Sequence, residues 1–484
     1  MSTLKRFFKD TIIYGIAAVL PRAINILLVK LHTNALQSEK FAVNTLYFVY
    51  AAYFNAFLTY GMETAFFRFF TKEKEKGKVI STSFISILTT TILFLFFTLI
   101  FSVELSVFFG FDNPIYLQIL ILVTTFDTLL VIPYAYLRVK NQPIRFAFYK
   151  ILNITIYALL NLVFLMYLPK AIENGSYAPQ YFIDIYNQYP LVIFIFIANL
   201  IASVITFILL IPIIFQFKFD FDIALLKKML KYAFPLLIAS LAYVTNENLD
   251  KILLDRMIGK EQMGIYAACY KLGVFMILYI MAFRLGAEPF FFNQATKNNA
   301  KETYAKVLKW FTVLGTITIL IIINYIDVFA NMLLGKAEYF SALNIVPIIL
   351  LSNLFLGIYY NLAIWYKLTD KTKYAMYFSV FGAIVTILIN IIFIPEYGYM
   401  ASAWATLIAY VSMTLASYFY GKKNYPIPYE AKNILFYIII SFILSMISFS
   451  FFRQNYQIST IILVLFILTI YIKEKTELQN IFKK

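Results

Sequence analysis

The feature that most constrains this chain is a series of long apolar runs that recurs along its whole length. A helix needs about 20 mostly apolar residues to cross a bilayer, and about fourteen runs approach or exceed that length. They cover residues 11–31, 41–62, 80–103, 115–137, 146–168, 190–216, 232–254, 264–286, 307–327, 342–364, 375–395, 399–420, 432–452 and 458–472. Apolar residues make up 62% of the chain, against about 45–50% in soluble domains. We therefore predict an all-α, polytopic membrane protein with about 14 transmembrane helices.

The basic residues are distributed unevenly between these runs. If the N-terminus lies inside, most of the 41 Lys and Arg residues fall in eight segments that face the cytoplasm. These segments are 5–9, 68–78, 138–150, 218–231, 297–309, 367–373, 422–432 and 473–484. The opposite loops hold few, such as Lys40, Lys170, Lys336 and Arg453. This positive-inside pattern predicts cytoplasmic N- and C-termini. It also accounts for the net charge of +16 without a nucleic-acid partner.

Several classes of protein are excluded by what the sequence lacks. With one cysteine, Cys269, and one histidine, His32, the chain has no internal disulfide framework and no His-rich metal site. It has no P-loop and no HExxH motif, and its outer loops are too short for a typical catalytic domain. We predict a protein that is not an enzyme and holds neither a metal nor a cofactor.

A short amphipathic segment divides the chain into two halves. Residues 219–231 read as a basic helix on the inner membrane surface, with Asp220 or Asp222 as its N-cap. Gly61-Met62-Glu63 with Phe66-Phe67 recurs 225 positions later (286 − 61) as Gly286-Ala287-Glu288 with Phe291-Phe292. Six spans separate the two copies, which indicates a parallel repeat. The predicted parts are an N-lobe (1–216), a linker (217–231), a C-lobe (232–421) and two further helices with the tail (422–484).

Charged residues inside the spans are candidates for function, because each costs about 2.5–3.5 kcal/mol on insertion. Arg22 lies near the middle of the first span, beside Pro21 and one turn from Asn25. A midplane arginine has no route to either interface, so Arg22 is the leading candidate for a substrate contact. Lys271 and Arg284 lie in the eighth span, and Arg284 is equally compatible with an anchor at the inner interface.

The seventh span carries the densest charge of any span. Glu247, Lys251 and Asp255 are spaced four residues apart, and Asp250 follows Asn246 at the same spacing. Two interpretations stay open, an internal salt-bridge network that joins helices or the wall of a polar cavity. In the second, Arg22, Asn25, Lys251, Lys271 and Arg284 form a cationic lumen for an anionic head group. Asp250, Glu247 and Asp127 are then candidates for coupling to a sodium or proton gradient.

Several motifs together resemble a known family. They are Leu230–Leu236 (LKYAFPL), Asn248–Leu254 (NLDKILL), Gly259 with Gly264-Ile265-Tyr266, Leu137-Arg138 with Arg145–Tyr149, and Asn390 with Ile394–Tyr399 (IPEYGY). The chain resembles the Wzx-type flippases of the polysaccharide biosynthesis protein family, in the multidrug/oligosaccharidyl-lipid/polysaccharide (MOP) exporter superfamily. The likeness covers most of the chain, although each motif alone is loose.

The resemblance implies two six-helix lobes in a V, with two additional C-terminal helices, in the bacterial cytoplasmic membrane. It implies transport of undecaprenyl-pyrophosphate-linked oligosaccharide by alternating access, alongside other polysaccharide-assembly membrane proteins. Related lipid II flippases use arginines of the first and eighth helices, and here Arg22, Lys271 and Arg284 occupy those helices. The alternatives are a lipid II flippase, a multidrug exporter and, in another class, a membrane glycan polymerase or ligase.

Overall fold

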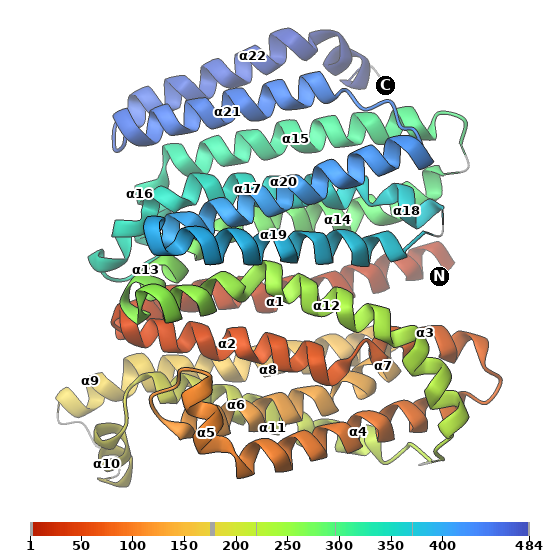
Figure 1. The fold of residues 1–484 in the computed structure, drawn as a ribbon, viewed down its shortest axis with the longest axis vertical. Helices are drawn as coiled ribbons and strands as arrows, with labels where there is room; N and C mark the ends of the chain where they lie inside the picture. The colour runs from red at the N-terminus through yellow and green to blue at the C-terminus, as the bar shows by residue number, and fades with distance from the viewer. Residues whose placement is uncertain (1–2, 175–179, 219, 296, 370, 483–484) are drawn as a thin grey trace. The chain divides into compact units, whose positions relative to one another are not determined.

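The computed structural model describes residues 3–174, 180–218, 220–295, 297–369 and 371–482, and within them it contains helices and no strand (Figure 1). Thirteen of the described helical stretches are long and apolar enough to cross a membrane, and each overlaps one predicted run. The remaining predicted run, 232–254, lies in a 36-residue helix, α12. Helix α12 is not among the thirteen, and its second half carries Glu247, Asp250, Lys251 and Asp255. The prediction of an all-α, polytopic membrane protein is confirmed.

The chain forms two compact units, Met1–Gly264 and Ile265–Lys484. The first contains α1 (Thr3–Ala35), α2 (Ser38–Thr59), α3 (Met62–Lys72), α4 (Lys76–Ile100), α5 (Ser102–Phe108), α6 (Pro114–Leu129), α7 (Val131–Val139), α8 (Pro143–Leu162), the π-helix η1 (Val163–Tyr167), α9 (Leu168–Glu173), α10 (Gln180–Gln188), α11 (Val192–Ile214) and α12 (Ile223–Ile258). Helix α13 (Lys260–Tyr270) crosses the division.

The second unit continues to the C-terminus and ends in a helical hairpin, α21–α22. It contains the 3₁₀ turn η2 (Lys271–Gly273), α14 (Val274–Gln294), α15 (Ala300–Asn324), α16 (Ile326–Leu333), the 3₁₀ segment η3 (Ala337–Ile345), α17 (Val346–Leu362), α18 (Ile364–Leu368), α19 (Lys373–Tyr397), α20 (Tyr399–Asn424), α21 (Ala431–Phe451) and α22 (Tyr456–Phe482). Helices α15, α21 and α22 pack together, as do α17, α19 and α20.

Helix α12 joins two segments that the sequence treats separately. The carboxylate of Asp222 accepts hydrogen bonds from the backbone N–H groups of Ala224 (2.8 Å) and Leu225 (3.0 Å), so Asp222 is the N-cap. From Ile223 the amphipathic segment then runs unbroken past Pro235 into the charged span. Helix α12 packs along α2 and α3 inside the first unit, whereas the sequence assigned the seventh span to the C-lobe. The two-lobe arrangement itself stays a prediction.

A periodic apolar face fixes the start of α12. Leu225, Met229 and Ala233 recur every four residues and are buried in one hydrophobic cluster with α3, α4, α7 and α11. Lys227 and Lys228 point away from this cluster and are exposed. The amphipathic pattern is therefore a packing face against neighbouring helices and a charged face outside.

The repeated glycine motif adopts different conformations in its two copies. Gly61 has φ +73° between α2 and α3, and a Cβ there would lie 2.8 Å from Cβ of Leu236 and 3.0 Å from the carbonyl oxygen of Ala233. This close approach to α12 and the positive φ both require glycine. Gly286 lies inside continuous α14 with open space around it. The sequence repeat is therefore not matched by a repeated break in the helix.

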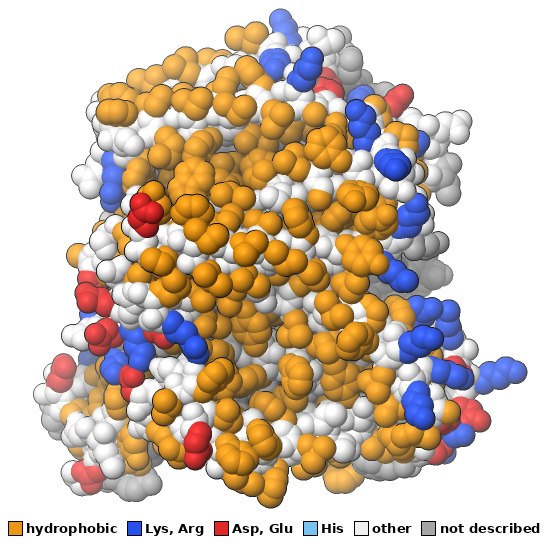
Figure 2. Space-filling view, in the orientation of Figure 1, with side chains coloured by type: hydrophobic (Ala, Val, Ile, Leu, Met, Phe, Trp, Pro, Cys, Tyr) orange, Lys and Arg blue, Asp and Glu red, His pale blue; other side chains and the backbone are white. Residues whose placement is uncertain are grey.

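Charged side chains gather at the ends of the helices, and apolar side chains cover their middle lengths (Figure 2). In the first unit, Lys72, Lys74, Lys78 and Lys228, from two predicted cytoplasmic segments, line one hollow. In the second unit, the ammonium of Lys371 donates to Asn424 (2.6 Å), which joins the predicted cytoplasmic segments 367–373 and 422–432. The predicted basic segments thus meet within each unit.

Candidate functional site

A polar cavity of about 520 Å³ lies inside the first unit. Its walls come from α2, α6, α7, α8 and α12, and most of its lining is polar or aromatic. The lining residues are Ala52, Asn55, Ala56, Thr59, Asp127, Leu130, Val131, Tyr134, Lys150, Asn153, Ser240, Tyr243 and Val244. Ligand sites are commonly of this size and carry a few convergent polar groups. A cavity of this kind among membrane helices is a candidate functional site.

Asp127 and Lys150 supply the two opposite charges of this cavity. The hydroxyl of Ser203 donates to Oδ1 of Asp127 (2.8 Å). The ammonium of Lys150 lies 4.2 Å from the centre of the Tyr134 ring, where a cation–π interaction stabilises it. One turn along α8, Asn153 donates to Thr206 of α11 (3.0 Å). Both charges therefore have a protein partner and a side open to the cavity.

Sequence reasoning found one of these residues and missed the others. The sequence predicts Asp127 as a candidate for ion coupling, but it places Lys150 only among the basic residues of an inner segment. A usable signal was present, because Lys150 and Asn153 are three residues apart and Asn55 and Thr59 are four apart. Such spacings place polar residues on one face of a helix. When two apolar spans each carry such a polar face, the two faces are expected to line a common polar cavity.

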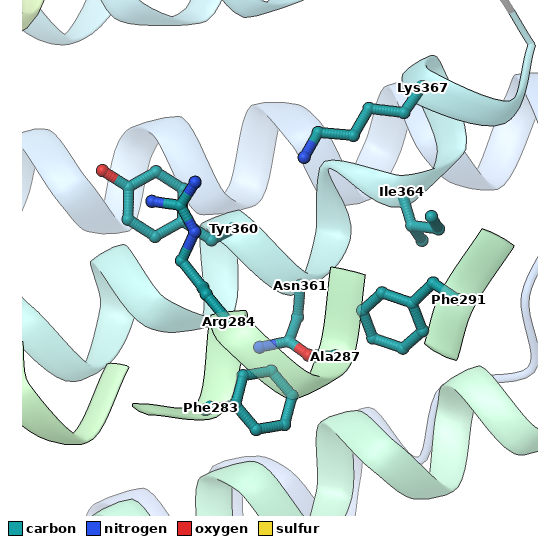
Figure 3. A pocket seen from close by; sticks show the side chains of 8 residues that line it. All are labelled: Phe283, Arg284, Ala287, Phe291, Tyr360, Asn361, Ile364 and Lys367. Atoms are coloured by element: carbon teal, nitrogen blue, oxygen red, sulfur yellow. The ribbon is translucent and has the colours of Figure 1, made fainter. Parts of the chain in front are cut away.

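A small pocket near the basic end of the second unit contains Arg284 (Figure 3). It is lined by Phe283, Arg284, Ala287 and Phe291 of α14, Tyr360 and Asn361 of α17, and Ile364 and Lys367 of α18. The guanidinium of Arg284 lies over the ring of Tyr360, 4.4 Å from its centre. The pocket volume is about 10 Å³, which is room for one water-sized group.

Asn361 gives this pocket an acceptor as well as its cations. Its side chain is 4% exposed, and its amide nitrogen donates to the carbonyl oxygen of Gly357 (3.0 Å). The amide oxygen is buried and has no hydrogen-bond partner among the described residues. A buried acceptor of this kind costs free energy unless a donor reaches it. Arg284 and Lys367 suit an anionic group, and Asn361 suits a hydroxyl or N–H group beside it.

The charged stretch of α12 forms a buried ion pair. The ammonium of Lys251 lies 2.9 Å from Oδ1 of Asp250 and 2.7 Å from the carbonyl oxygen of Glu247. Lys251 and Asp250 are 5% and 2% exposed. Both members of this pair belong to α12, so the pair does not itself join two helices, and little of either charge is open to a ligand in the present conformation.

Three further predicted residues lie on exposed surfaces. Arg22 and Asn25 are exposed on α1, three residues apart and therefore on one face of that helix. Lys271 is exposed at η2, where the chain tightens between α13 and α14. Arg22 and Asn25 do not line the cavity of the first unit, and Lys271 does not line the Arg284 pocket. Their role as substrate contacts stays a prediction.

Within the described ranges, no group of three or more His, Cys, Asp or Glu side chains is placed to hold a metal ion. The cavity of the first unit instead holds one charge of each sign with amides, hydroxyl groups and aromatic rings. The Arg284 pocket holds two cations with an amide and aromatic rings.

Comparisons with known proteins agree with this architecture. The sequence model of a family described as "Polysaccharide biosynthesis protein" matches residues 7–287, and that of the MatE family matches residues 235–392. No curated protein sequence matches the chain.

Solved structures share the fold at low identity. A structure of the lipid II flippase MurJ in an inward closed conformation has a TM-score of 0.76 and 17% identity, covering 96% of this chain and 100% of that one. An inward-facing multidrug resistance MATE transporter of the MOP superfamily has a TM-score of 0.66 and 12% identity, covering 83% and 94%. The MATE multidrug transporter DinF-BH has a TM-score of 0.62 and 15% identity, covering 90% and 97%.

Proposed function

Because this chain belongs to the polysaccharide biosynthesis protein family, we propose that it moves a polyprenyl-pyrophosphate-linked oligosaccharide across the bacterial cytoplasmic membrane. The family and the fold make it a multi-pass membrane transporter or flippase of the MOP superfamily. The proposal goes further in three respects: the substrate is a lipid-linked glycan, the membrane is the inner membrane, and both termini are cytoplasmic.

The Arg284 pocket is the observation that carries this proposal. Pyrophosphate oxygens accept from guanidinium and ammonium groups, and Arg284 and Lys367 supply both (Figure 3). The amide oxygen of Asn361 accepts from a sugar hydroxyl, and Phe283 and Phe291 provide apolar surface beside it. The charges and polar groups of the pocket therefore suit an anionic, hydroxylated head group, and because its volume is about 10 Å³ the pocket has to widen before a whole head group enters.

The proposed cycle alternates between access from the inner and the outer leaflet. Arg22, Asn25, Lys271 and Arg284 hold the head group while the polyprenyl chain stays in lipid. A ligand shifts such an equilibrium only through its different affinity for the two states. The buried Lys251–Asp250 pair becomes accessible to the substrate only if α12 moves. In this proposal Lys251 therefore contacts the substrate in another state of the cycle.

A sodium or proton gradient gives the cycle its direction in this proposal. Asp127 is the preferred coupling residue, because its carboxylate faces a cavity large enough for water while Ser203 holds its position. Asp250 is 2% exposed, so it and Glu247 are weaker candidates in this conformation.

A lipid II flippase is the second candidate function, favoured by the TM-score of 0.76 with MurJ. Both substrates present a polyprenyl pyrophosphate, so the Arg284 pocket fits both and only the sugar distinguishes them. A multidrug exporter of organic cations fits less well, because Arg284 and Lys367 repel a positive ligand.

Proteoliposomes that contain fluorescent undecaprenyl-pyrophosphate-linked oligosaccharide or lipid II in the inner leaflet test the function. We expect the wild type to expose the oligosaccharide substrate to an external glycosidase. We expect Arg284→Ala, and Arg22→Ala combined with Lys271→Ala, to slow this by at least about tenfold, since each lost charged contact contributes about 1.5–3 kcal/mol.

Arg145→Ala is the matched control, because Arg145 is an exposed arginine that donates to Gln142 (3.2 Å) on the surface of the first unit. Its transport rate should equal that of the wild type. Faster movement of lipid II than of the oligosaccharide substrate favours the second candidate. Unchanged transport in the Arg284 and Arg22/Lys271 variants contradicts the site assignment.

A further inference from the structure

The connection between α20 and α21 forms a strap, residues 425–430, beside the Arg284 pocket. Its sequence is Tyr-Pro-Ile-Pro-Tyr-Glu, and two prolines in six residues restrict the backbone. Ile427 is 8% exposed and is buried in a hydrophobic cluster with Ala287, Phe291 and Ile364. These three residues also line the Arg284 pocket. The strap therefore packs against the wall of that pocket.

Aromatic residues of the strap extend the same contact. Tyr425 and Tyr429 pack against the cluster, and the ammonium of Lys301 lies 4.7 Å from the centre of the Tyr425 ring. The pocket residues Phe283 and Ile364 belong to this assembly as well. Half of the residues that line the pocket thus share one hydrophobic cluster with the strap.

A buried ion cluster holds the far end of the strap. Glu430 lies 3.1 Å from the ammonium of Lys309 on α15, and its other oxygen accepts from Asn433 (2.7 Å). Lys309 is 2% exposed and also binds Glu474 (2.9 Å) and Glu477 on α22. Lys309 therefore retains two carboxylate partners if Glu430 loses its charge.

We propose that Glu430 is a positioning residue for the Arg284 pocket. Through its bond to Lys309 it holds the strap against α14 and α18, and the strap keeps the pocket wall in place. As a statement about ligand binding this rests on the proposed function, whereas the coupling between Glu430 and the pocket wall does not. Glu430→Gln is the informative change, since it keeps the shape, removes the charge and leaves the α22 anchor.

The second unit offers a matched control at the opposite end of the same hairpin. Arg453 binds Asp327 through Nη2 and Nε, at 2.7 and 3.0 Å. This pair ties the α21–α22 turn to α16 and does not involve the strap. Arg453→Gln therefore loosens the hairpin by a comparable interaction without touching residues 425–430.

Cysteine labelling measures the position of the pocket wall directly. The single native cysteine, Cys269, is buried and donates to the carbonyl oxygen of Tyr339, so Cys269→Ser gives a suitable background. Ile364→Cys reports on the pocket, and Ala330→Cys, in α16, reports on the other end of the unit. Both native side chains are buried, at 3% and 0% exposure. The reagent is a water-soluble maleimide on the full-length protein in detergent.

We expect Glu430→Gln to raise the labelling rate of Ile364→Cys by about tenfold, the effect of one lost hydrogen bond to a charged group. The rate at Ala330→Cys should stay unchanged, and Arg453→Gln should leave the Ile364→Cys rate within about twofold. An unchanged rate at Ile364→Cys in Glu430→Gln overturns the proposal. Equal increases at both reporters, or the same increase in Arg453→Gln, also overturn it, because they indicate general loosening.

Binding of farnesyl pyrophosphate to the purified protein separates this proposal from the proposed function. We expect Glu430→Gln to weaken binding by up to about tenfold and Arg453→Gln to leave it unchanged. If the wild type does not bind the probe but labelling follows the expected pattern, the function fails and the positioning role holds. If the wild type binds and Glu430→Gln binds equally well, the positioning role fails.

Discussion

Lys309 and Lys150 are both lysines of membrane helices, and the two units use them in opposite ways. Lys309 is 2% exposed and is surrounded by the carboxylates of Glu430, Glu474 and Glu477. Lys150 faces a cavity of about 520 Å³ together with Asp127. The first lysine has its hydrogen-bonding capacity filled by protein, and the second has capacity left for water or a ligand.

This difference distinguishes a structural charge from a candidate functional one, and the position of a charge in the sequence does not reveal it. Indole and phenol groups complete the Lys309 cluster, because Trp310 donates to Glu477 (3.1 Å) and Tyr437 donates to Glu474 (2.7 Å). A satisfied cluster of this kind rigidifies a packed region. The cavity of the first unit has one charge of each sign and open volume between its walls.

Removal of the structural lysine should have the largest effect. Lys309→Met leaves three carboxylates close together without their shared cation, and breaking a buried ion pair costs about 3–5 kcal/mol. We expect a marked fall in the thermal unfolding midpoint of the detergent-solubilised protein, followed by size-exclusion chromatography.

Lys301→Met is the control, since Lys301 is exposed and contacts only the face of Tyr425 among the interactions described above. It should unfold at nearly the wild-type temperature. A Lys309→Met protein as stable as the wild type contradicts the structural role of the cluster.

The Lys251–Asp250 pair tests whether α12 carries a second structural charge. Lys251→Met removes a hydrogen-bonded counter-charge from buried Asp250 and should lower stability by about 3 kcal/mol. Lys251→Met combined with Asp250→Asn should recover part of that loss, because neutralising both partners leaves no excess charge. The measurement is a double-mutant cycle of thermal unfolding. The pairing is contradicted if the double variant loses more unfolding free energy than the two single variants lose in sum.

The sequence predicted the frame of the molecule well, for a physical reason. Apolar length and the distribution of Lys and Arg are local properties, so the spans follow from them, including α12 despite its charges. A local pattern also limits the N-cap to Asp220 or Asp222, and the structure shows that it is Asp222. Lys309 was assigned to an inner basic segment, and its burial depends on Glu430, Glu474 and Glu477, which lie 121 to 168 residues away.

The candidate sites were less predictable for the same reason. The sequence identified Asp127 and Arg284 as unusual, but no local pattern states that Lys150 faces Asp127 or that Asn361 lies beside Arg284. Those pairings arise when α6 packs near α8 and when α14 packs on α17. Charge within a span indicates a candidate, and tertiary packing decides whether it is satisfied or open.

Asp127→Asn should distinguish the open site from the structural cluster, because it should change the transport rate and leave the stability nearly unchanged. An asparagine retains an acceptor for Ser203 and removes a charge that is costly to keep within membrane helices. We expect stability within about 1 kcal/mol of the wild type and a transport rate at least about tenfold lower. Ser203→Ala should have a smaller effect on transport, because it keeps the carboxylate. Full transport by Asp127→Asn excludes Asp127 from coupling.

Substitution of Asp222 should have the smallest effect on stability of the changes proposed. Its carboxylate caps α12 through the N–H groups of Leu225 and Ala224, and the hydrogen bond from Leu225 holds the pKa of Asp222 below its ordinary value. A lowered folded-state pKa stabilises the protein at pH values above the unfolded-state pKa, which is about 3.9. This stabilisation is lost as the pH falls through the folded-state pKa.

Asp222→Ala should therefore lower the unfolding midpoint slightly near neutral pH, and the difference from the wild type should shrink below about pH 4. Asp220→Ala is the matched control, because Asp220 is exposed two residues before the cap and should show no such difference. Since this carboxylate lies outside the spans, its removal should leave transport unchanged, in contrast to Asp127→Asn. A loss of transport in Asp222→Ala without loss of folded protein would show that the start of α12 does more than anchor that helix.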